Sequence, residues 1–198
     1  MTDNKKIRKE IRSKRRHLTI KQQQIAADQL ADQLINHTTF KNSQNIACYL
    51  ATEGELSLMP FIYACWQRNK NVFLPVLQPR NHHPLWFAAF TQTTPLIPNR
   101  YGILEPQHNK KQRKMKIITL DSIFVPLVAF DLHGNRIGMG AGYYDRTLKH
   151  LKTRSHWLRP HLIGVGYEFQ QEKNITTNKW DVPMHFISTD KAVYRVKK

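Results

Sequence analysis

The sequence predicts a single α/β domain in which helices cover both faces of a mostly parallel central sheet, an α/β/α layering. A chain of 198 residues, 40% of them hydrophobic, is long enough for one compact core and short for two. An apolar run at Asn45–Ala51, a helical pattern at Leu58–Trp66 and a second apolar run at Asn71–Leu77 form a strand–helix–strand unit. Such a unit predicts a parallel crossover, and we expect one domain over residues 1–198.

Two helices are expected between Asp3 and His37, a stretch without proline or glycine. Apolar residues recur there at helical spacing: Ile7, Ile11, Leu18, Ile25, Leu30 and Leu34. Thr19, with Gln22 three residues later, has the pattern of a capping box, in which hydroxyl and amide satisfy unpaired backbone N–H groups. We therefore expect the second helix to begin after Thr19.

The chain beyond Leu77 predicts further strands and one long loop. Leu85–Phe90 has the pattern of a third strand, placed at an edge. Thr91–Met115 is rich in proline, glycine and polar residues, which predicts an ordered surface loop around the island Tyr101–Pro106. The remaining extended segments, the last two after a short helix, are Ser122–Val128, His161–Gly166 and Phe186 with Val193–Val196. Functional loops are expected beyond the ends of these strands.

Composition narrows the function. The formal net charge of +17 indicates anionic partners: nucleic acid, an anionic membrane face, or small molecules that carry phosphates and carboxylates. Cys48 and Cys65 lie far apart in apolar stretches, as expected for reduced thiols in a cytoplasmic protein. The N-terminus is charged, and no stretch approaches the roughly 18 apolar residues of a membrane span. We therefore expect neither export nor a membrane anchor.

The most informative stretch places glycines at three alternate positions, Gly138, Gly140 and Gly142. Residues without a Cβ let successive backbone N–H groups face one concavity, which binds phosphate or another oxyanion. A helix that begins near Tyr143 would add its unpaired N–H groups. The spacing matches neither the dinucleotide fingerprint nor a Walker A loop, and a purely structural turn is the alternative.

Polar and aromatic residues crowd around these glycines, where a mere turn needs none: Arg136, Tyr143, Tyr144, Asp145 and Arg146. A carboxylate at Asp145 would repel a phosphate bound by the glycines unless a cation lay between them. Mg²⁺ suits that place because it takes few protein carboxylates and completes its shell with water and phosphate oxygens. The alternative is that Asp145 is a first-turn helix carboxylate favoured by the helix dipole.

Several motifs in order resemble the 5-formyltetrahydrofolate cyclo-ligase family, also called 5,10-methenyltetrahydrofolate synthetase. The closest likeness runs from Ile123 to Leu148, with the sequence VPLVAFD before the cluster Arg136–Arg146. The others, spread over most of the chain, are Arg15–Thr19, Tyr49–Leu56, Tyr101–Pro106, Gly164–Tyr167 and Trp180–Pro183.

The resemblance implies a layered fold of the NagB/RpiA/CoA-transferase type and an ATP-dependent reaction. In it ATP phosphorylates the formyl oxygen of 5-formyltetrahydrofolate, N10 closes the ring, and phosphate leaves, so that the products are 5,10-methenyltetrahydrofolate, ADP and phosphate. Such a reaction chiefly requires positioning and charge neutralisation. It further implies Mg²⁺, a folate with or without extra glutamates, and a cytoplasmic monomer that binds no specific nucleic acid and no membrane.

The resemblance also implies roles for individual residues. Arg136, Tyr144 and Asp145 take catalytic roles, and Asp145 and Asp181 bind the metal. The nucleotide is bound by the segments Asn4, Lys5, Lys6, Ile7, Arg8 and Arg136, Ile137, Gly138, Met139, Gly140, Ala141, Gly142, Tyr143, Tyr144. The folate is bound by Leu50, Glu55, Met139, Gly140, Ala141, Gly142 and Tyr143. This chain departs from the family at Asn4, where a lysine is usual, and either Lys5 or Lys6 could supply that contact.

Plainer interpretations stand beside these roles. Glu55 could be a solvated turn residue, and Asp181 could cap a local turn before Pro183. The basic run Lys5–Arg16 could be a solvated helix face. At the level of the whole protein, the charge and the four tryptophans would also suit a nucleic-acid-binding module, although no RRM, KH or zinc-finger spacing is present.

Overall fold

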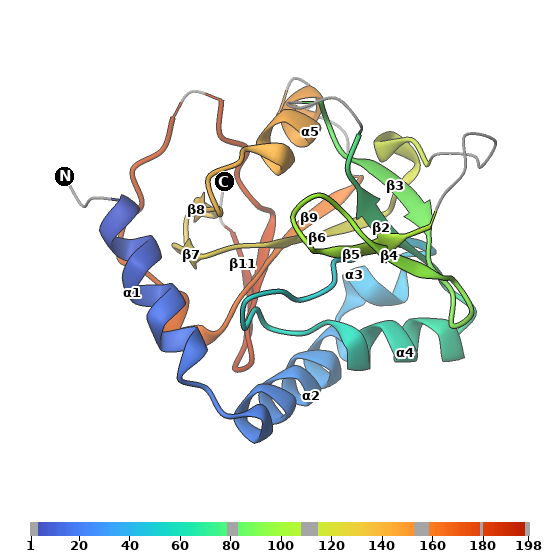
Figure 1. Cartoon of the computed structure of the whole chain (residues 1–198), viewed down its shortest axis with the longest axis horizontal. Coiled ribbons are helices and arrows are strands. Elements are labelled where there is room, and N and C mark those ends of the chain that lie inside the picture. The colour runs from blue at the N-terminus through green and yellow to red at the C-terminus, as the bar shows by residue number, and fades with distance from the viewer. Residues whose placement is uncertain (1–3, 79–82, 108–114, 153–158, 179, 197–198) are drawn as a thin grey trace.

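The main sheet has seven strands, and its five central strands are parallel (Figure 1). The computed structural model describes residues 4–78, 83–107, 115–152, 159–178 and 180–196. The strands follow the order β11 (Val193–Arg195), β10 (Phe186–Ser188), β9 (His161–Val165), β6 (Ser122–Pro126), β1 (Asn45–Ala47), β2 (Asn71–Val76), β3 (Trp86–Ala89). The two edge strands β3 and β11 are antiparallel to their neighbours, and the predicted mostly parallel α/β sheet is confirmed.

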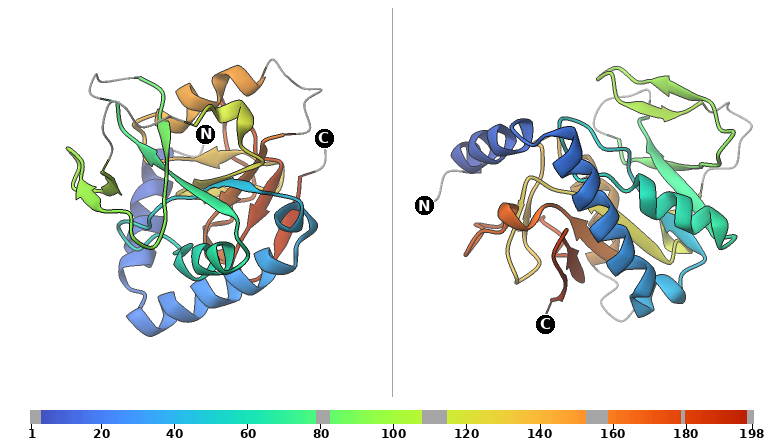
Figure 2. Two further views of the ribbon diagram at one scale, coloured as in Figure 1. Left: turned by 90° about the vertical axis from the view of Figure 1, so that its right-hand side faces the viewer. Right: turned by 90° about the horizontal axis from the view of Figure 1, so that it is seen from below.

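Helices cover both faces of the sheet because its strands are apolar on both sides. In β6, Phe124 packs with α2 (Ile20–Asn36), α3 (Thr38–Lys41) and α4 (Met59–Gln67) on one face. Ile123 and Val125 pack on the other face with α5 (Tyr143–Lys152) and near the 3-10 helix η1 (Ile117–Thr119). Figure 2 shows these layers from two further sides. None of the described helices is long and apolar enough to cross a membrane.

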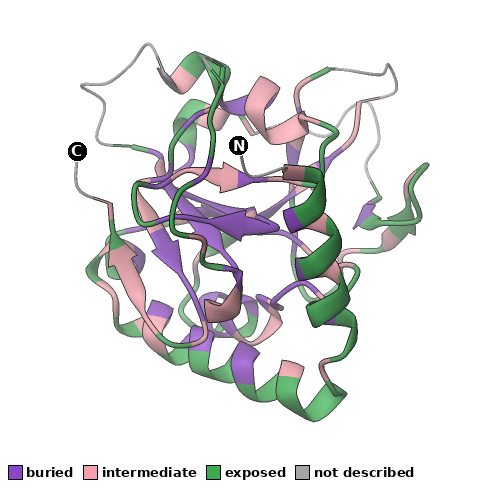
Figure 3. Ribbon diagram, turned by 90° about the vertical axis from the view of Figure 1, so that its left-hand side faces the viewer, coloured by how far each residue is buried: buried purple, intermediate pink, exposed green. Residues whose placement is uncertain are grey.

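The two N-terminal helices are separate, as the sequence predicts. After α1 (Asn4–Arg16), Thr19 accepts the backbone N–H of Gln22, and the Gln22 side chain bonds back to Thr19, which completes the capping box. α1 buries Ile7 and Ile11 against the strand β7 (Ala129–Phe130), while its outer face is exposed (Figure 3). The interpretation of Lys5–Arg16 as a solvated helix face is therefore correct only for the residues on the outer side of α1.

Three segments differ from the prediction. The strand at Asn45–Ala51 is regular only to Ala47, because the chain then leaves the sheet. The predicted loop Thr91–Met115 contains a hairpin, β4 (Leu96–Pro98) with β5 (Leu104–Pro106), which forms a separate two-stranded sheet beside β2 (Figure 2). Its part 108–114 lies outside the described residues. The apolar run from Ser122 ends as a strand at Pro126 and continues into a second hairpin, β7 with β8 (Arg136–Ile137).

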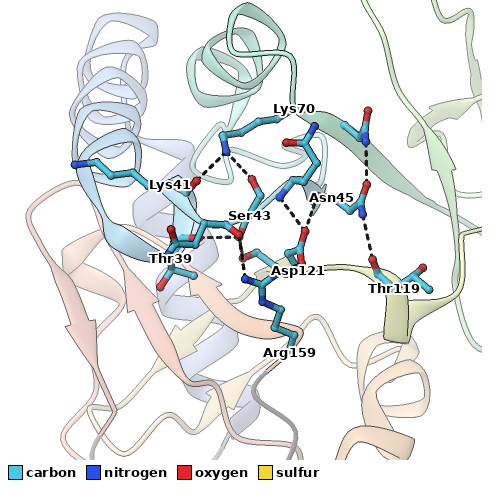
Figure 4. A network of polar contacts seen from close by, with 12 residues as sticks. Thr39, Lys41, Ser43, Asn45, Lys70, Thr119, Asp121 and Arg159 are labelled. Atoms are coloured by element: carbon cyan, nitrogen blue, oxygen red, sulfur yellow. Dashed lines mark hydrogen bonds and ion pairs between the residues drawn. The ribbon is translucent and has the colours of Figure 1, made fainter.

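Asp121 joins three segments at the edge where the parallel strands begin (Figure 4). Its Oδ2 accepts the backbone N–H groups of Gln44 and Asn45, both at 2.8 Å, and its Oδ1 pairs with the Arg159 guanidinium. Lys70 donates beside it to the Ser43 carbonyl. These contacts hold the starts of β1, β6 and β9 together, and they lie at the edge opposite the candidate site.

Candidate active site

Several of the predicted site residues come together at the carboxyl end of the parallel strands. The chain leaves β1 for the segment that carries Glu55, leaves β6 for the β7–β8 hairpin and the glycine loop, and leaves β9 for Tyr167 and the 3-10 helix η2 (Glu168–Gln170). In a parallel sheet these segments must emerge at one edge, which is where ligands bind in open α/β folds. α1 crosses this edge and supplies Arg8 and Arg15 to it (Figure 1).

Asp131 builds the turn that aims Arg136 at the site. Its Oδ1 accepts the backbone N–H groups of His133 at 3.0 Å and Asn135 at 2.9 Å, which closes the turn between β7 and β8. Gly134 completes the turn with φ +82°, and a Cβ there would lie 2.7 Å from the Met184 carbonyl oxygen. Asp131 and Gly134 thus stabilise the local fold that positions Arg136.

Two arginines hold the glycine loop, residues 138–142, from its two ends. Arg8 Nε donates to the Gly138 carbonyl at 2.8 Å, and Arg146 Nη2 donates to the Ala141 carbonyl at 2.8 Å. Gly140 has φ +105°, and a Cβ added at Gly138 or Gly140 would meet nothing within 4 Å. With those carbonyl oxygens occupied and one side open, the loop can present its N–H groups to an anion, which favours the nest interpretation over a plain turn.

Arg136 lies behind the loop between two carboxylates. Its side chain is 5% exposed, its Nη1 donates to the Val182 carbonyl at 2.6 Å, and its Nη2 pairs with Asp145. Burial lowers the pKa of Arg136, and the charges of Asp145 and Asp181 oppose that shift. Asp181 also accepts the backbone N–H of Asn178 at 2.7 Å, so it does cap a local turn, as its plainer interpretation supposes.

The Mg²⁺ expectation can be tested against this donor set. Within the described ranges there is no group of three or more His, Cys, Asp or Glu side chains that could hold a metal alone. Mg²⁺ nevertheless binds through one or two carboxylates plus water and phosphate oxygens. The negative charges of Asp145 and Asp181 both act on Arg136 beside the open loop, and two such carboxylates fit that requirement.

Glu55 is a buried carboxylate, so its interpretation as a solvated turn residue is wrong. It is 8% exposed, and its Oε2 accepts the Thr52 backbone N–H at 3.0 Å and the Thr52 hydroxyl at 3.2 Å. Its Oε1 lies 4.0 Å from Arg15 Nη1. Burial raises the pKa of Glu55, against the opposing effects of Thr52 and Arg15. Leu50, the apolar residue expected beside it, is partly buried against the same core.

Two tyrosine hydroxyls next to this carboxylate are buried without a partner. The hydroxyls of Tyr144 and Tyr167 are out of solvent and make no hydrogen bond within the part of the chain that the structure describes. Burial, followed by the negative charge of Glu55, raises the pKa of Tyr144. Buried polar groups usually find a partner, so these hydroxyls mark a place where a ligand or water completes the bonding.

Tyr143 connects the glycine loop to the β4–β5 hairpin, a connection that was not predicted. Its hydroxyl accepts from Arg100 Nη2 at 2.7 Å and lies 3.0 Å from the Tyr101 hydroxyl. The Arg146 guanidinium lies 5.0 Å from the centre of the Tyr143 ring. The hydrogen bonds with Tyr101 and Arg100 lower the pKa of Tyr143, and the bond with Tyr101 has the larger effect. The only sequence signal was the island Tyr101–Pro106, to which no role was given.

The N-terminal residues expected to bind the nucleotide lie on different faces of α1. Ile7 is 4% exposed and belongs to the core, whereas Arg8 one residue later reaches the glycine loop. Asn4 is partly buried and Lys5 is exposed, and Lys6 lies 4.0 Å from Glu10 in an exposed ion pair. Arg8 is thus the residue of this segment that the structure places at the site.

Arg15 is a site residue to which sequence reasoning gave no role. It is 0% exposed, and its guanidinium reaches Glu55 and the Met139 sulfur. A signal was present, because Arg15 follows Ile7 and Ile11 at intervals of four and therefore lies on the buried stripe of its helix.

Comparison with known proteins gives a consistent result. A model of the 5-formyltetrahydrofolate cyclo-ligase family matches residues 1–190. A 5-formyltetrahydrofolate cyclo-ligase from Haemophilus influenzae is 42% identical over 178 residues, which are 90% of this chain and 92% of the relative. One from Escherichia coli strain K12 is 34% identical over 187 residues, 93% of this chain and 98% of the relative.

A solved structure agrees with the sequence relatives. The 5,10-methenyltetrahydrofolate synthetase of Aquifex aeolicus matches with a TM-score of 0.81 and 28% identity, covering 98% of this chain and 93% of that protein. The likeness therefore extends to the whole arrangement of the sheet and its helices. Nucleic-acid binding, the alternative that the charge left open, gains no support from these relatives.

Proposed function

Because this chain belongs to the 5-formyltetrahydrofolate cyclo-ligase family, we propose that it converts 5-formyltetrahydrofolate to 5,10-methenyltetrahydrofolate with ATP at the glycine-loop edge. The observation that carries the proposal is the open glycine loop, which Arg8 and Arg146 hold by two carbonyl oxygens and behind which Arg136 is buried. We treat residues 1–198 as the single domain of this enzyme.

The terminal phosphate of ATP belongs at the loop. Its oxygens would meet the N–H groups of residues 138–142 and the N-terminus of α5, where the helix dipole favours negative charge. Arg136 and Arg8 place two cations against the same charge. Met139 and Ala141 leave the loop itself without a cationic side chain, so flanking arginines must supply the positive charge.

The reaction requires two substitutions. The formyl oxygen attacks the terminal phosphorus as the bond to ADP breaks, and N10 then adds to the formyl carbon, after which the carbon–oxygen bond breaks and phosphate leaves. N10 loses its proton in the process. The contribution of the residues is to hold the formyl oxygen in line with the terminal phosphorus and the leaving oxygen of ADP, to keep N10 near the formyl carbon, and to offset the charge that develops on phosphate oxygens. Tyr144, next to Glu55, is placed to contact the folate with its unpartnered hydroxyl.

Asp145 and Asp181 are proposed to hold Mg²⁺ between the carboxylates and the phosphate. When bound, Mg²⁺ would neutralise phosphate charge. Asp145 pairs with Arg136, so it would exchange or share that partner when the metal binds. The charge of Asp181 also acts on Arg136 and would continue to offset the buried guanidinium.

The folate is proposed to lie between Glu55, Leu50 and the loop residues Met139–Tyr143. A buried carboxylate is suited to accept from the amino and ring N–H groups of the pterin, and the partly buried Leu50 offers it an apolar contact. We further propose that the protein acts as a cytoplasmic monomer, that polyglutamylated folates are accepted, and that neither nucleic acid nor a membrane is a specific partner.

Incubation of the purified protein with 5-formyltetrahydrofolate, ATP and Mg²⁺ tests the proposal directly. The methenyl product absorbs in the near ultraviolet, and its formation should match the release of ADP mole for mole. Omission of ATP is the control. A folded protein that forms no methenyl product from active folate would overturn the proposed function.

A further inference from the structure

Arg15 carries a charge in a place that packing alone does not explain. The residue is 0% exposed, although arginine is rarely buried without paired partners. It lies on α1 at the same face as Ile7 and Ile11, where a leucine or isoleucine would continue the buried stripe. The presence of a guanidinium there requires a function that an apolar side chain could not supply.

The partners of Arg15 are few and point to the candidate site. Its Nη1 lies 4.0 Å from Glu55 Oε1, and its Nη2 lies 3.9 Å from the sulfur of Met139 in the glycine loop. Its Nε makes no hydrogen bond to any described residue. A guanidinium has five N–H donors, so this one is incompletely satisfied and acts on Glu55 chiefly through its charge.

Burial and one neighbouring charge oppose the ionisation of Glu55. Glu53 on its own turn is negatively charged, and the tyrosines on which the Glu55 charge acts, Tyr49, Tyr144 and Tyr167, add no positive charge. Burial removes the carboxylate from water as well. Thr52 donates two hydrogen bonds, and Arg15 is the cation among the groups that act on it.

We infer that Arg15 is a positioning residue for the cyclo-ligase reaction: it keeps the buried Glu55 carboxylate ionised and directed towards the folate beside the glycine loop. This inference rests on the proposed function, in which Glu55 contacts the pterin. Arg15 touches Glu55 on one side and Met139 on the other, so it also fixes the spacing between the folate-binding carboxylate and the phosphate loop.

The test measures binding of 5-formyltetrahydrofolate by calorimetry in the absence of ATP, from about pH 5.5 to about pH 8, together with kcat at saturating folate. Arg15→Met removes the charge and keeps an unbranched side chain, and Arg15→Lys restores a charge. Arg16→Met is the matched control, because Arg16 is the next residue of α1 and is exposed.

For Arg15→Met we expect Kd near neutral pH to rise about tenfold while kcat changes less than about threefold. Without Arg15 the pKa of Glu55 rises further, so a larger share of the carboxyl is protonated at low pH, and the excess Kd should shrink as the pH increases. Arg15→Lys should recover part of the affinity, and Arg16→Met should match the wild type at every pH.

A double-mutant cycle with Glu55→Gln decides whether Arg15 acts through Glu55. If it does, Arg15→Met adds little to Glu55→Gln, and the double variant loses the pH dependence. Additive losses, or an Arg15→Met variant with wild-type affinity and pH profile, would overturn the inference. A wild-type protein that neither binds nor converts the folate refutes the proposed function instead, while an active wild type with an unaffected Glu55→Gln variant refutes the role of Glu55.

Thermal unfolding of each variant separates binding from folding. If Arg15→Met does not fold but Arg15→Lys does, the lysine variant is compared with the wild type, and weaker binding with unchanged kcat supports the inference. If neither variant folds, Arg15 serves the core of the protein and the inference is wrong.

Discussion

Arg136 is the residue on which the charge balance of the site depends. It is held by the Val182 carbonyl and by Asp145, with the charge of Asp181 also acting on it. A nearly buried guanidinium cannot leave these partners without a large desolvation penalty. We therefore expect Arg136 to stay in place if a nucleotide binds, whereas Asp145, whose side chain is 31% exposed, is the partner that could turn to a metal.

At the scale of one residue, we expect Asp145→Asn to lower kcat by roughly a hundredfold and to raise the Mg²⁺ concentration that gives half-maximal rate. The amide keeps the shape of the side chain and can still accept from Arg136, so the melting temperature should change little. Asp28→Asn, at an exposed position of α2, is the control. A variant that keeps wild-type Mg²⁺ dependence would show that Asp145 binds no metal.

The sequence named candidate site residues, but it could not show their surroundings. The pattern Arg136–Arg146 indicated an anion site because three alternate glycines lie within it and an arginine stands at each end. It could not reveal that Glu55 is 8% exposed, because burial of that carboxylate depends on α1, which is remote in sequence. Arg15 was overlooked for the same reason, although its position on the apolar stripe of its helix was visible.

Within the glycine loop, two substitutions can separate the requirement for an unusual backbone conformation from the requirement for open space at the proposed phosphate site. Gly140 has φ +105°, a region that residues with a Cβ rarely adopt, whereas Gly138 does not have a positive φ. We expect Gly140→Ala to lower the free energy of unfolding by about 1–3 kcal/mol. Gly138→Ala should leave it unchanged.

Both alanine substitutions should nevertheless weaken ATP binding. Each added Cβ would occupy the open space at the loop that is proposed for the phosphate. We expect the KM for ATP to rise about tenfold in each variant, which corresponds to about 1.4 kcal/mol. Steady-state kinetics beside urea unfolding separates the two effects. If the KM for ATP were normal in both variants, the phosphate would bind elsewhere.

Helices were easier to predict than hairpins. The capping box at Thr19 and the spacing of Ile7 and Ile11 placed α1 and α2 because both signals are local. The β4–β5 hairpin was missed, since its strands are three residues each and include Pro98 and Pro106, which are typical of loops. Its bond from Arg100 to Tyr143 spans 43 residues of sequence, beyond any local pattern.

At the scale of the whole molecule, the two edges of the sheet have different tasks. The candidate site lies at the edge where the strands end, and the edge where they begin is held together by Asp121 (Figure 4). Burial alone would raise the pKa of Asp121, but the Asn45 and Gln44 N–H groups and Arg159 outweigh it and lower the pKa. A carboxyl with a lowered pKa adds stability above its unfolded-state pKa and loses it as the pH falls through its folded-state pKa.

We expect Asp121→Asn to lower the free energy of unfolding by about 2 kcal/mol at neutral pH, since hydrogen bonds to a charged acceptor are lost. The difference from the wild type should shrink below about pH 4, where the wild-type carboxyl is itself protonated. Urea unfolding at several pH values measures this, and kcat and KM should be unaffected. A constant difference across pH would show that the charge of Asp121 plays no part.

The net charge of +17 belongs to the molecule rather than to one site. Because ATP and folates are anions, we expect kcat/KM to fall severalfold as the salt concentration rises from about 0.05 M to about 0.5 M, while kcat changes little. A neutral viscosity agent at matched concentration is the control. Insensitivity to salt would show that local contacts alone capture the substrates.

The turn at Gly134 has an effect beyond its own hairpin. Any Cβ there would strike the Met184 carbonyl, and Met184 lies two residues from Val182, whose carbonyl accepts from Arg136. A side chain at position 134 would therefore displace the segment that holds Arg136, and a substitution there should disturb the candidate site from a distance.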